Sequence, residues 1–227
     1  MTALIERVKG ARNIVAKKSS ALLMISQPNT PDLPPIPETK REVEVIRQQL
    51  SGNKLPFSCL EENAATLESV TMDIESHSCI HLACHAVQNP GEPLKSGFHL
   101  YDGKLELSEI LKKNLPNAGF AFLSACQTST GDEKLSEEAV HLGAGMLAAG
   151  YQGVVATMWS IKDAYGPIVA ENFYSQLLVR GAAEGGGGLN SAGAAHVLHY
   201  AIQSLRQRVG DSEDALLSWV PYVHFGL

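Results

Sequence analysis

Short hydrophobic runs alternate along the 227-residue chain with stretches in which apolar residues recur every three to four positions. The first pattern predicts buried β-strands and the second predicts amphipathic helices. The predicted strands are 20–26, 57–60, 78–84, 119–125, 153–159 and 218–227. The predicted helices are 38–50, 63–76, 107–116, 137–150, 163–181 and 190–208. Strands that alternate with helices of this length favour an α/β fold, with a mostly parallel central sheet and helices on both faces.

Two connections between these elements have their own signatures. Asp102-Gly103 lies between two arms of alternating pattern in 98–107, which predicts a β-hairpin. Residues 27–37 read QPNTPDLPPIP and are too rich in proline for regular structure, so a loop is expected there.

Composition narrows the class of protein. The length suits one domain, expected at 20–227 after a lead-in or linker at 1–19. A net charge of −6, without a basic stripe that includes aromatic residues, argues against a nucleic-acid partner. Neither a membrane helix nor a signal peptide is evident, which favours a cytoplasmic protein with free cysteines and no membrane partner. The cysteines and histidines lack metal-ligand spacing, so neither a metal nor another cofactor is expected.

Two of the buried runs end in reactive side chains. Residues 79–88 read CIHLACHAVQ and contain His85, and residues 121–131 read AFLSACQTSTG and contain Cys126. Functional sites of open α/β sheets form at the carboxyl ends of the strands. If the two strands are neighbours, His85 and Cys126 lie about 5 Å apart, as a Cys–His dyad requires. On the pattern alone, two packed core residues remain the alternative.

Four motifs in the chain resemble the CHAT family of caspase-fold, clan CD peptidases. This family is related to separase and its members are often attached to tetratricopeptide repeats. The resemblance runs from about Ser20 to Leu227 and implies a caspase-like three-layer sandwich. The motifs are HLACHA (81–86), LSACQT (123–128) with a glycine shortly after it, VVATMWSIKD (154–163) and WVPYVHFG (219–226).

The resemblance also assigns roles to individual residues. Cys126 matches the nucleophile and His85 the general base, with the backbone amides of Ala86 and Cys126 as the expected oxyanion hole. The family has glycine where this chain has Ala86, which departs from the pattern. Asp163 matches a carboxylate that binds a basic P1 side chain, although capping of the helix that starts at Ala164 is the alternative. Trp159 is expected as a pocket wall or core residue, and Gln127 as a substrate contact.

Together these features predict a cytosolic cysteine endopeptidase that cleaves protein or peptide substrates through a thioester acyl-enzyme, with a basic P1 preference implied by the resemblance. One alternative is a catalytically silent or partner-regulated interaction module in a signalling complex, with a regulatory partner or tetratricopeptide-repeat region outside this chain. A second alternative is a thiol hydrolase that acts on small acyl substrates.

Overall fold

A computed structural model describes residues 21–124, 126–127, 139–183, 189 and 191–226, and describes Cys126 and Gln127 by their backbone. The predicted lead-in at 1–19 lies outside the described residues, as does the stretch 128–138 that follows Gln127.

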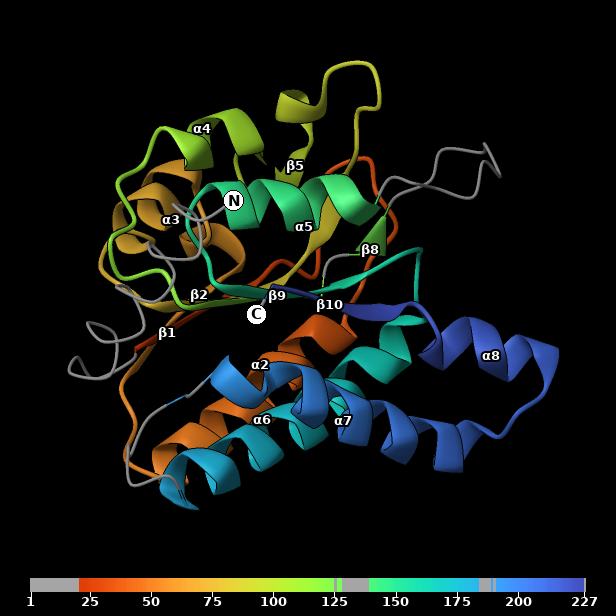
Figure 1. The fold of residues 1–227 in the computed structure, drawn as a ribbon. Coiled ribbons are helices and arrows are strands. Elements are labelled where there is room, and N and C mark those ends of the chain that lie inside the picture. Colours follow the sequence, from red (N-terminus) through yellow and green to blue (C-terminus); the bar gives the residue numbers. More distant parts are fainter. Residues whose placement is uncertain (1–20, 125, 128–138, 184–188, 190, 227) are drawn as a thin grey trace, which may run out of the picture.

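A six-stranded sheet lies at the centre of the described part of the chain, with the strand order β10-β9-β7-β3-β1-β2 (Figure 1). Neighbouring strands are parallel except at one edge, where β10 runs antiparallel to β9. The strands are β1 (Leu22–Ser26), β2 (Phe57–Glu61), β3 (Cys79–Ala83), β7 (Phe120–Leu123), β9 (Gly153–Thr157) and β10 (Tyr222–Gly226).

The hydrophobic runs become central strands because both of their faces are buried. Along β1, Leu22 and Met24 pack into one hydrophobic cluster, whereas Leu23 and Ile25 pack into a second cluster on the opposite face. This alternation is the period of two that an extended strand imposes on its side chains. A strand buried on both faces needs a layer of helices on each side.

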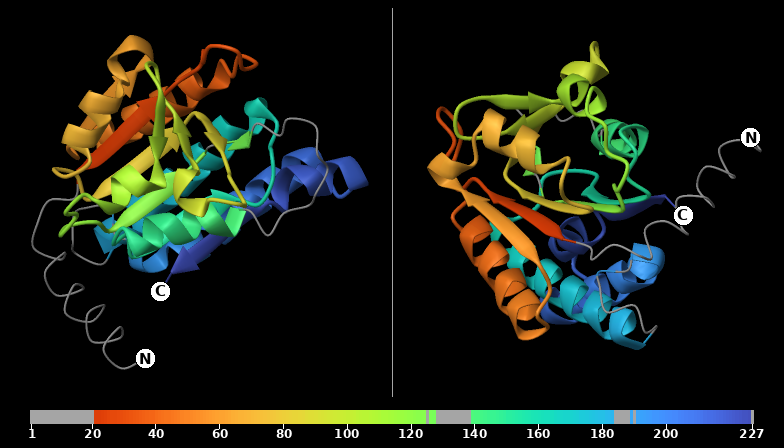
Figure 2. Two further views of the ribbon diagram at one scale, coloured as in Figure 1. Left: turned by 90° about the horizontal axis from the view of Figure 1, so that it is seen from above. Right: turned by 90° about the vertical axis from the view of Figure 1, so that its left-hand side faces the viewer.

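Helices supply both outer layers, so the molecule has three layers (Figure 2). One layer is made of long helices and the other of shorter ones. None of the described helices is long and apolar enough to cross a bilayer. The first layer contains α2 (Glu38–Gly52), α6 (Gly166–Ala183) and α7 (Ala194–Val209), and the second α3 (Leu67–Asp73), α4 (Leu107–Leu111) and α5 (Ala139–Ala148).

A second, smaller sheet has the strand order β6-β5-β4-β8. Its antiparallel pair β5/β6 is the hairpin predicted around Asp102-Gly103, with Leu100 N–H donating to the Gly103 carbonyl at 2.8 Å. The other two strands were not predicted from the sequence. The strands are β4 (His85–Val87), β5 (Gly97–His99), β6 (Lys104–Glu106) and β8 (Cys126–Gln127).

Two further differences from the sequence prediction arise at helix ends. Helix α3 begins only after Thr66, whose hydroxyl accepts from the Ser69 N–H at 3.1 Å, and it is shorter than expected. The strand predicted from residue 218 begins only at Tyr222, because helix α8 (Glu213–Trp219) precedes it. Ser212 caps α8 through the Ala215 N–H.

Candidate active site

His85 and Cys126 are direct neighbours in the small sheet. Strands β4 and β8 run parallel, and their register pairs His85 with Cys126 and Ala86 with Gln127. Neighbouring strands lie about 4.8 Å apart. Because β3 and β7 are also neighbours in the central sheet, the two chain segments stay side by side as they leave it. The sequence placed both residues at the ends of central strands, whereas the structure places them just beyond, in short strands of their own.

The His85 side chain is held in one orientation. It is only 4% exposed, and its Nε2–H donates to the Pro34 carbonyl oxygen at 2.7 Å. The other ring nitrogen, Nδ1, is buried and has no hydrogen-bond partner in the described part of the chain. A carbonyl can only accept, so this bond places a proton on Nε2, and in the neutral imidazole Nδ1 then carries the lone pair. Pro34 therefore orients His85 through its main chain.

The Pro34 carbonyl reaches His85 because the proline-rich loop folds back over the end of β1. The loop is fixed at its base by Gln27 N–H to the Ala83 carbonyl, and across its width by Ile36 N–H to the Pro28 carbonyl, both at 2.9 Å. Asp32 turns the chain with φ 63°, a conformation that a short polar side chain tolerates.

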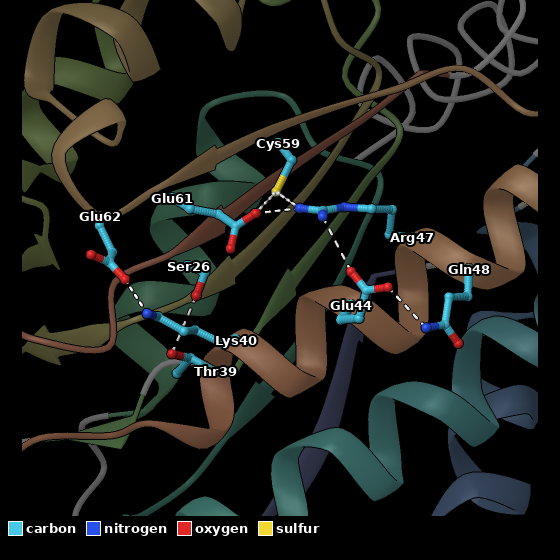
Figure 3. A network of polar contacts seen from close by, with 9 residues as sticks. All are labelled: Ser26, Thr39, Lys40, Glu44, Arg47, Gln48, Cys59, Glu61 and Glu62. Carbon is cyan, nitrogen blue, oxygen red and sulfur yellow. Dashed lines mark hydrogen bonds and ion pairs between the residues drawn. The ribbon is translucent and has the colours of Figure 1, made fainter.

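The exit from the loop is tied to the central sheet. The Thr39 hydroxyl, in the first turn of α2, donates to the Ile36 carbonyl at 2.9 Å. It also receives the Ser26 hydroxyl from the end of β1 at 3.3 Å (Figure 3). The loop is therefore anchored at both ends beside the carboxyl ends of β1 and β3, and His85 follows β3 directly.

Ala86, one of the two residues of the predicted oxyanion hole, lies inside the small sheet. It pairs with Phe98 of β5 on one side and with Gln127 of β8 on the other. Its methyl group is fully buried in the hydrophobic cluster below that sheet. Among the described non-glycine residues, positive φ occurs only at Asp32, Lys54 and Glu62, so alanine at 86 carries no strain of that kind. The oxyanion role of the Ala86 and Cys126 amides stays a prediction.

Asp163 caps a helix, but not the one expected from the sequence. Its Oδ2 accepts the N–H of Glu38, at the start of α2, at 2.9 Å. Its pKa is raised, mainly because partial burial disfavours the charged carboxylate, and the nearby charges of Glu38 and Glu42 act in the same direction. His85 opposes this shift electrostatically, so the two residues lie within electrostatic reach of each other. Asp163 therefore lies at the start of α2, next to the loop whose Pro34 carbonyl meets His85.

Trp159 makes a side-chain contact within the protein, whereas Gln127 is described by its backbone alone. The Trp159 Nε1–H donates to the Leu217 carbonyl at 3.0 Å, which ties the segment after β9 to α8. For Gln127 only the backbone lies within the described residues, opposite Ala86. Substrate contact by either residue stays a prediction.

His81, four residues before His85, is a core residue. It is fully buried and stacks on Phe122 with ring centroids 5.0 Å apart. Its Nδ1 lies 3.1 Å from the Tyr174 hydroxyl, and its Nε2 lies 3.1 Å from Oε1 of the buried Glu42. The second of these contacts is an ion-pair distance without hydrogen-bond alignment. His81 therefore links β3 to α2 and α6 rather than facing a substrate.

Cys59 lies on the edge strand β2, away from His85, in a network of charged side chains (Figure 3). Arg47 donates to its Sγ at 3.3 Å and also to the Glu61 carboxylate. Although Arg47 favours the thiolate, burial disfavours it more and raises the pKa of Cys59 to about 11. Burial likewise raises the pKa of Cys79 to about 11. Cys84 is also a buried, reduced cysteine.

These raised pKa values predict that Cys59 and Cys79 react slowly with iodoacetamide at pH 7.5. A pKa of about 11 leaves a thiolate fraction over a hundredfold smaller than that of an ordinary thiol with pKa about 8.5. Peptide mapping by mass spectrometry after timed alkylation measures each site. In 6 M guanidinium the same cysteines should react at ordinary rates. Equal rates in the folded and unfolded chain would contradict the prediction.

Comparison with known proteins agrees with this architecture. The family model of the CHAT domain matches residues 2–227. The chain belongs to the CHAT domain family. A search of the curated proteins finds no match for this CHAT domain. No group of three or more potential metal-ligating side chains occurs among its described residues.

The solved structures with a similar fold include that of a cysteine proteinase. The crystal structure of the Arg-specific cysteine proteinase gingipain R has a TM-score of 0.58 and 13% identity, over 91% of the CHAT domain and 46% of the gingipain chain. The complex of the pro- and mature domains of RgpB from Porphyromonas gingivalis has a TM-score of 0.57 and 11% identity, over 92% and 47%. The CHAT domain thus spans just under half of each of these chains. The predicted caspase-like α/β fold is confirmed.

Proposed function

We propose that this CHAT domain is a cysteine endopeptidase, with Cys126 as the nucleophile and His85 as the base. The observation that carries the proposal is the direct pairing of His85 with Cys126 across β4 and β8. The hydrogen bond from Nε2 of His85 to the Pro34 carbonyl supports it, because that bond leaves Nδ1 able to accept a proton. A nucleophile, an adjacent base and a group that orients the base form the minimal set for covalent acyl transfer.

The proposed reaction has two halves. The Cys126 thiol transfers its proton to Nδ1 of His85, and the thiolate adds to the substrate carbonyl carbon. The tetrahedral intermediate collapses as the imidazolium returns the proton to the leaving amine, which leaves a thioester on Cys126. Water, deprotonated by His85, then hydrolyses the thioester and restores the thiol. Throughout, the Pro34 carbonyl keeps Nε2 protonated and the ring in place.

The substrate is proposed to be a protein or peptide with Arg or Lys at P1. The carboxylate of Asp163 is partly buried, and its pKa is raised mainly by desolvation. A guanidinium or ammonium group brought beside it would supply the missing positive charge. Gingipain R, which shares the fold, is named as Arg-specific.

Cleavage of a fluorogenic peptide library that varies P1 tests the proposal. Wild-type protein should release fluorophore and Cys126→Ala should not. Labelling of Cys126 by an electrophilic peptide provides a second readout that does not depend on turnover. Absence of both turnover and labelling in the wild type would favour a silent interaction module that keeps the fold.

The role of Asp163 is tested by Asp163→Asn, which keeps an oxygen that can cap α2 and removes the charge. We expect kcat/KM for a P1 Arg substrate to fall about 100-fold, and kcat/KM for a matched substrate with a neutral P1 residue to change little. Asp163→Ala serves as the comparison, because it also loses the cap and should cost about 1 kcal/mol of unfolding free energy. An unchanged P1 preference in Asp163→Asn would leave Asp163 with the capping role alone.

A further inference from the structure

A row of ionisable residues crosses the small sheet beside the proposed dyad. The register pairs Lys104 of β6 with His99 of β5, and His85 of β4 with Cys126 of β8. Between the two pairs, Ala86 lies opposite Phe98 in an antiparallel ladder. Continued by one residue, that ladder places His99 opposite His85.

These residues share one face of the small sheet. Directly opposed residues in neighbouring strands point to the same side, and successive residues alternate. The alternate positions Ala86, Phe98 and Leu105 are all buried in the hydrophobic cluster under the sheet. His85, His99 and Lys104 therefore project from the opposite face, about 5 Å apart from strand to strand.

His99 has basic neighbours on both sides within this row. On β6, the Lys104 ammonium lies 3.1 Å from Glu106 and donates to the Lys95 carbonyl at 2.8 Å. On β4, the neighbour is His85. The pKa of His99 is lowered, first by desolvation and then by the charges of His85 and Lys104. The lowered pKa favours the neutral imidazole of His99, which lies between Lys104 and the base of the proposed dyad.

We propose that His99 is a positioning residue that acts on the dyad through His85. While neutral, it lets His85 carry the proton taken from Cys126, and once protonated in acid it opposes that charge. The inference rests on the proposed function, because His99 affects catalysis only if His85 is the base of the dyad. The interaction between the two imidazoles is independent of whether any peptide is cleaved.

The direction of the effect follows from electrostatics. A positive charge at position 99 disfavours an imidazolium at position 85 about 5 Å away, and His85 acts on His99 to the same extent. A proton on His99 in acid therefore makes His85 a weaker acceptor for the Cys126 proton.

Histidine-resolved NMR titration of the folded chain tests the proposal directly. In His99→Lys the added positive charge should move the midpoint of His85 down by about half a pH unit or more, whereas the neutral His99→Gln should not lower it. In His85→Gln the midpoint of His99 should rise, because the charge of His85 no longer opposes its protonation.

A matched control adds the same charge elsewhere. His199 is exposed on α7, so His199→Lys should leave the midpoint of His85 in place. If the wild type cleaves peptides, His99→Lys should lower kcat at pH 7.5 more than His99→Gln does, with KM nearly unchanged. A His85 midpoint that moves by less than about 0.2 pH unit in both His99 variants overturns the proposal. Absence of peptide turnover alongside the predicted shifts would instead count against the proposed function only.

Discussion

Replacing His85 with alanine is expected to lower kcat/KM for peptide hydrolysis by about 10³-fold. The variant loses the proton acceptor for Cys126 and the donor for the leaving amine, so both chemical steps slow. His85 is buried and its ring meets the Pro34 carbonyl, so the substitution also leaves that oxygen without a partner. The rate of acylation, measured in single turnover with a fluorogenic ester and a matched amide, separates the effects. The amide should suffer more because its leaving group needs the proton.

Controls distinguish lost chemistry from lost structure. The exposed His199→Ala should keep full activity, and circular dichroism should show that His85→Ala remains folded. The double variant His85→Ala/Cys126→Ala should be no worse than Cys126→Ala alone, because members of one catalytic unit are not additive. An additive loss, or a His85→Ala variant with more than a tenth of wild-type activity, would falsify the dyad.

Gly97→Ala is expected to be the most damaging single-methyl change in the small sheet. A Cβ built on Gly97 would lie 2.2 Å from the carbonyl oxygen of Leu105 and 2.9 Å from the Cα of Glu106, both backbone atoms of the paired strand β6. Neither atom can move without separating β5 from β6. We expect about 3 kcal/mol of lost unfolding free energy, measured by urea denaturation, together with loss of the predicted peptidase activity.

Gly52→Ala is the matched control for this substitution. Gly52 is the last residue of α2, and a Cβ there meets nothing within 4 Å. Its stability should stay the same or rise by up to about 1 kcal/mol, because glycine is costly in a helix. If Gly97→Ala were as stable as Gly52→Ala, the close packing of β5 against β6 would be wrong.

The central layer of the fold was predictable because its information is local. Runs such as LLMI (22–25) are apolar at every position, which is typical of a short strand buried on both faces. Asp102-Gly103 likewise specifies its hairpin by turn chemistry alone. The adjacency of the His85 and Cys126 segments was only a condition of the predicted dyad, and the pairing of β3 with β7 and of β4 with β8 supplies it.

The parts that were missed depend on contacts between distant segments. Strands β4 and β8 have three and two residues, too few for any periodicity to appear. Asp163 caps a helix 125 positions away in sequence, so its own neighbourhood pointed to the wrong helix. Helix α8 had a usable local signal in Ser212 followed by Glu213 and Asp214, but the apolar residues after it were interpreted as strand.

The hydrogen bond between His85 and Pro34 has a consequence for how this site can change over time. Its acceptor is a peptide oxygen, which every amino acid carries, so no substitution at position 34 can delete the atom. A scan that replaces one side chain at a time would find the position silent as long as the loop keeps its path. The constraint falls instead on the shape of residues 27–37, on its prolines and on the turn at Asp32. Homologous chains can thus preserve the interaction while sharing no residue at that position, and a comparison of amino-acid sequences alone would overlook it.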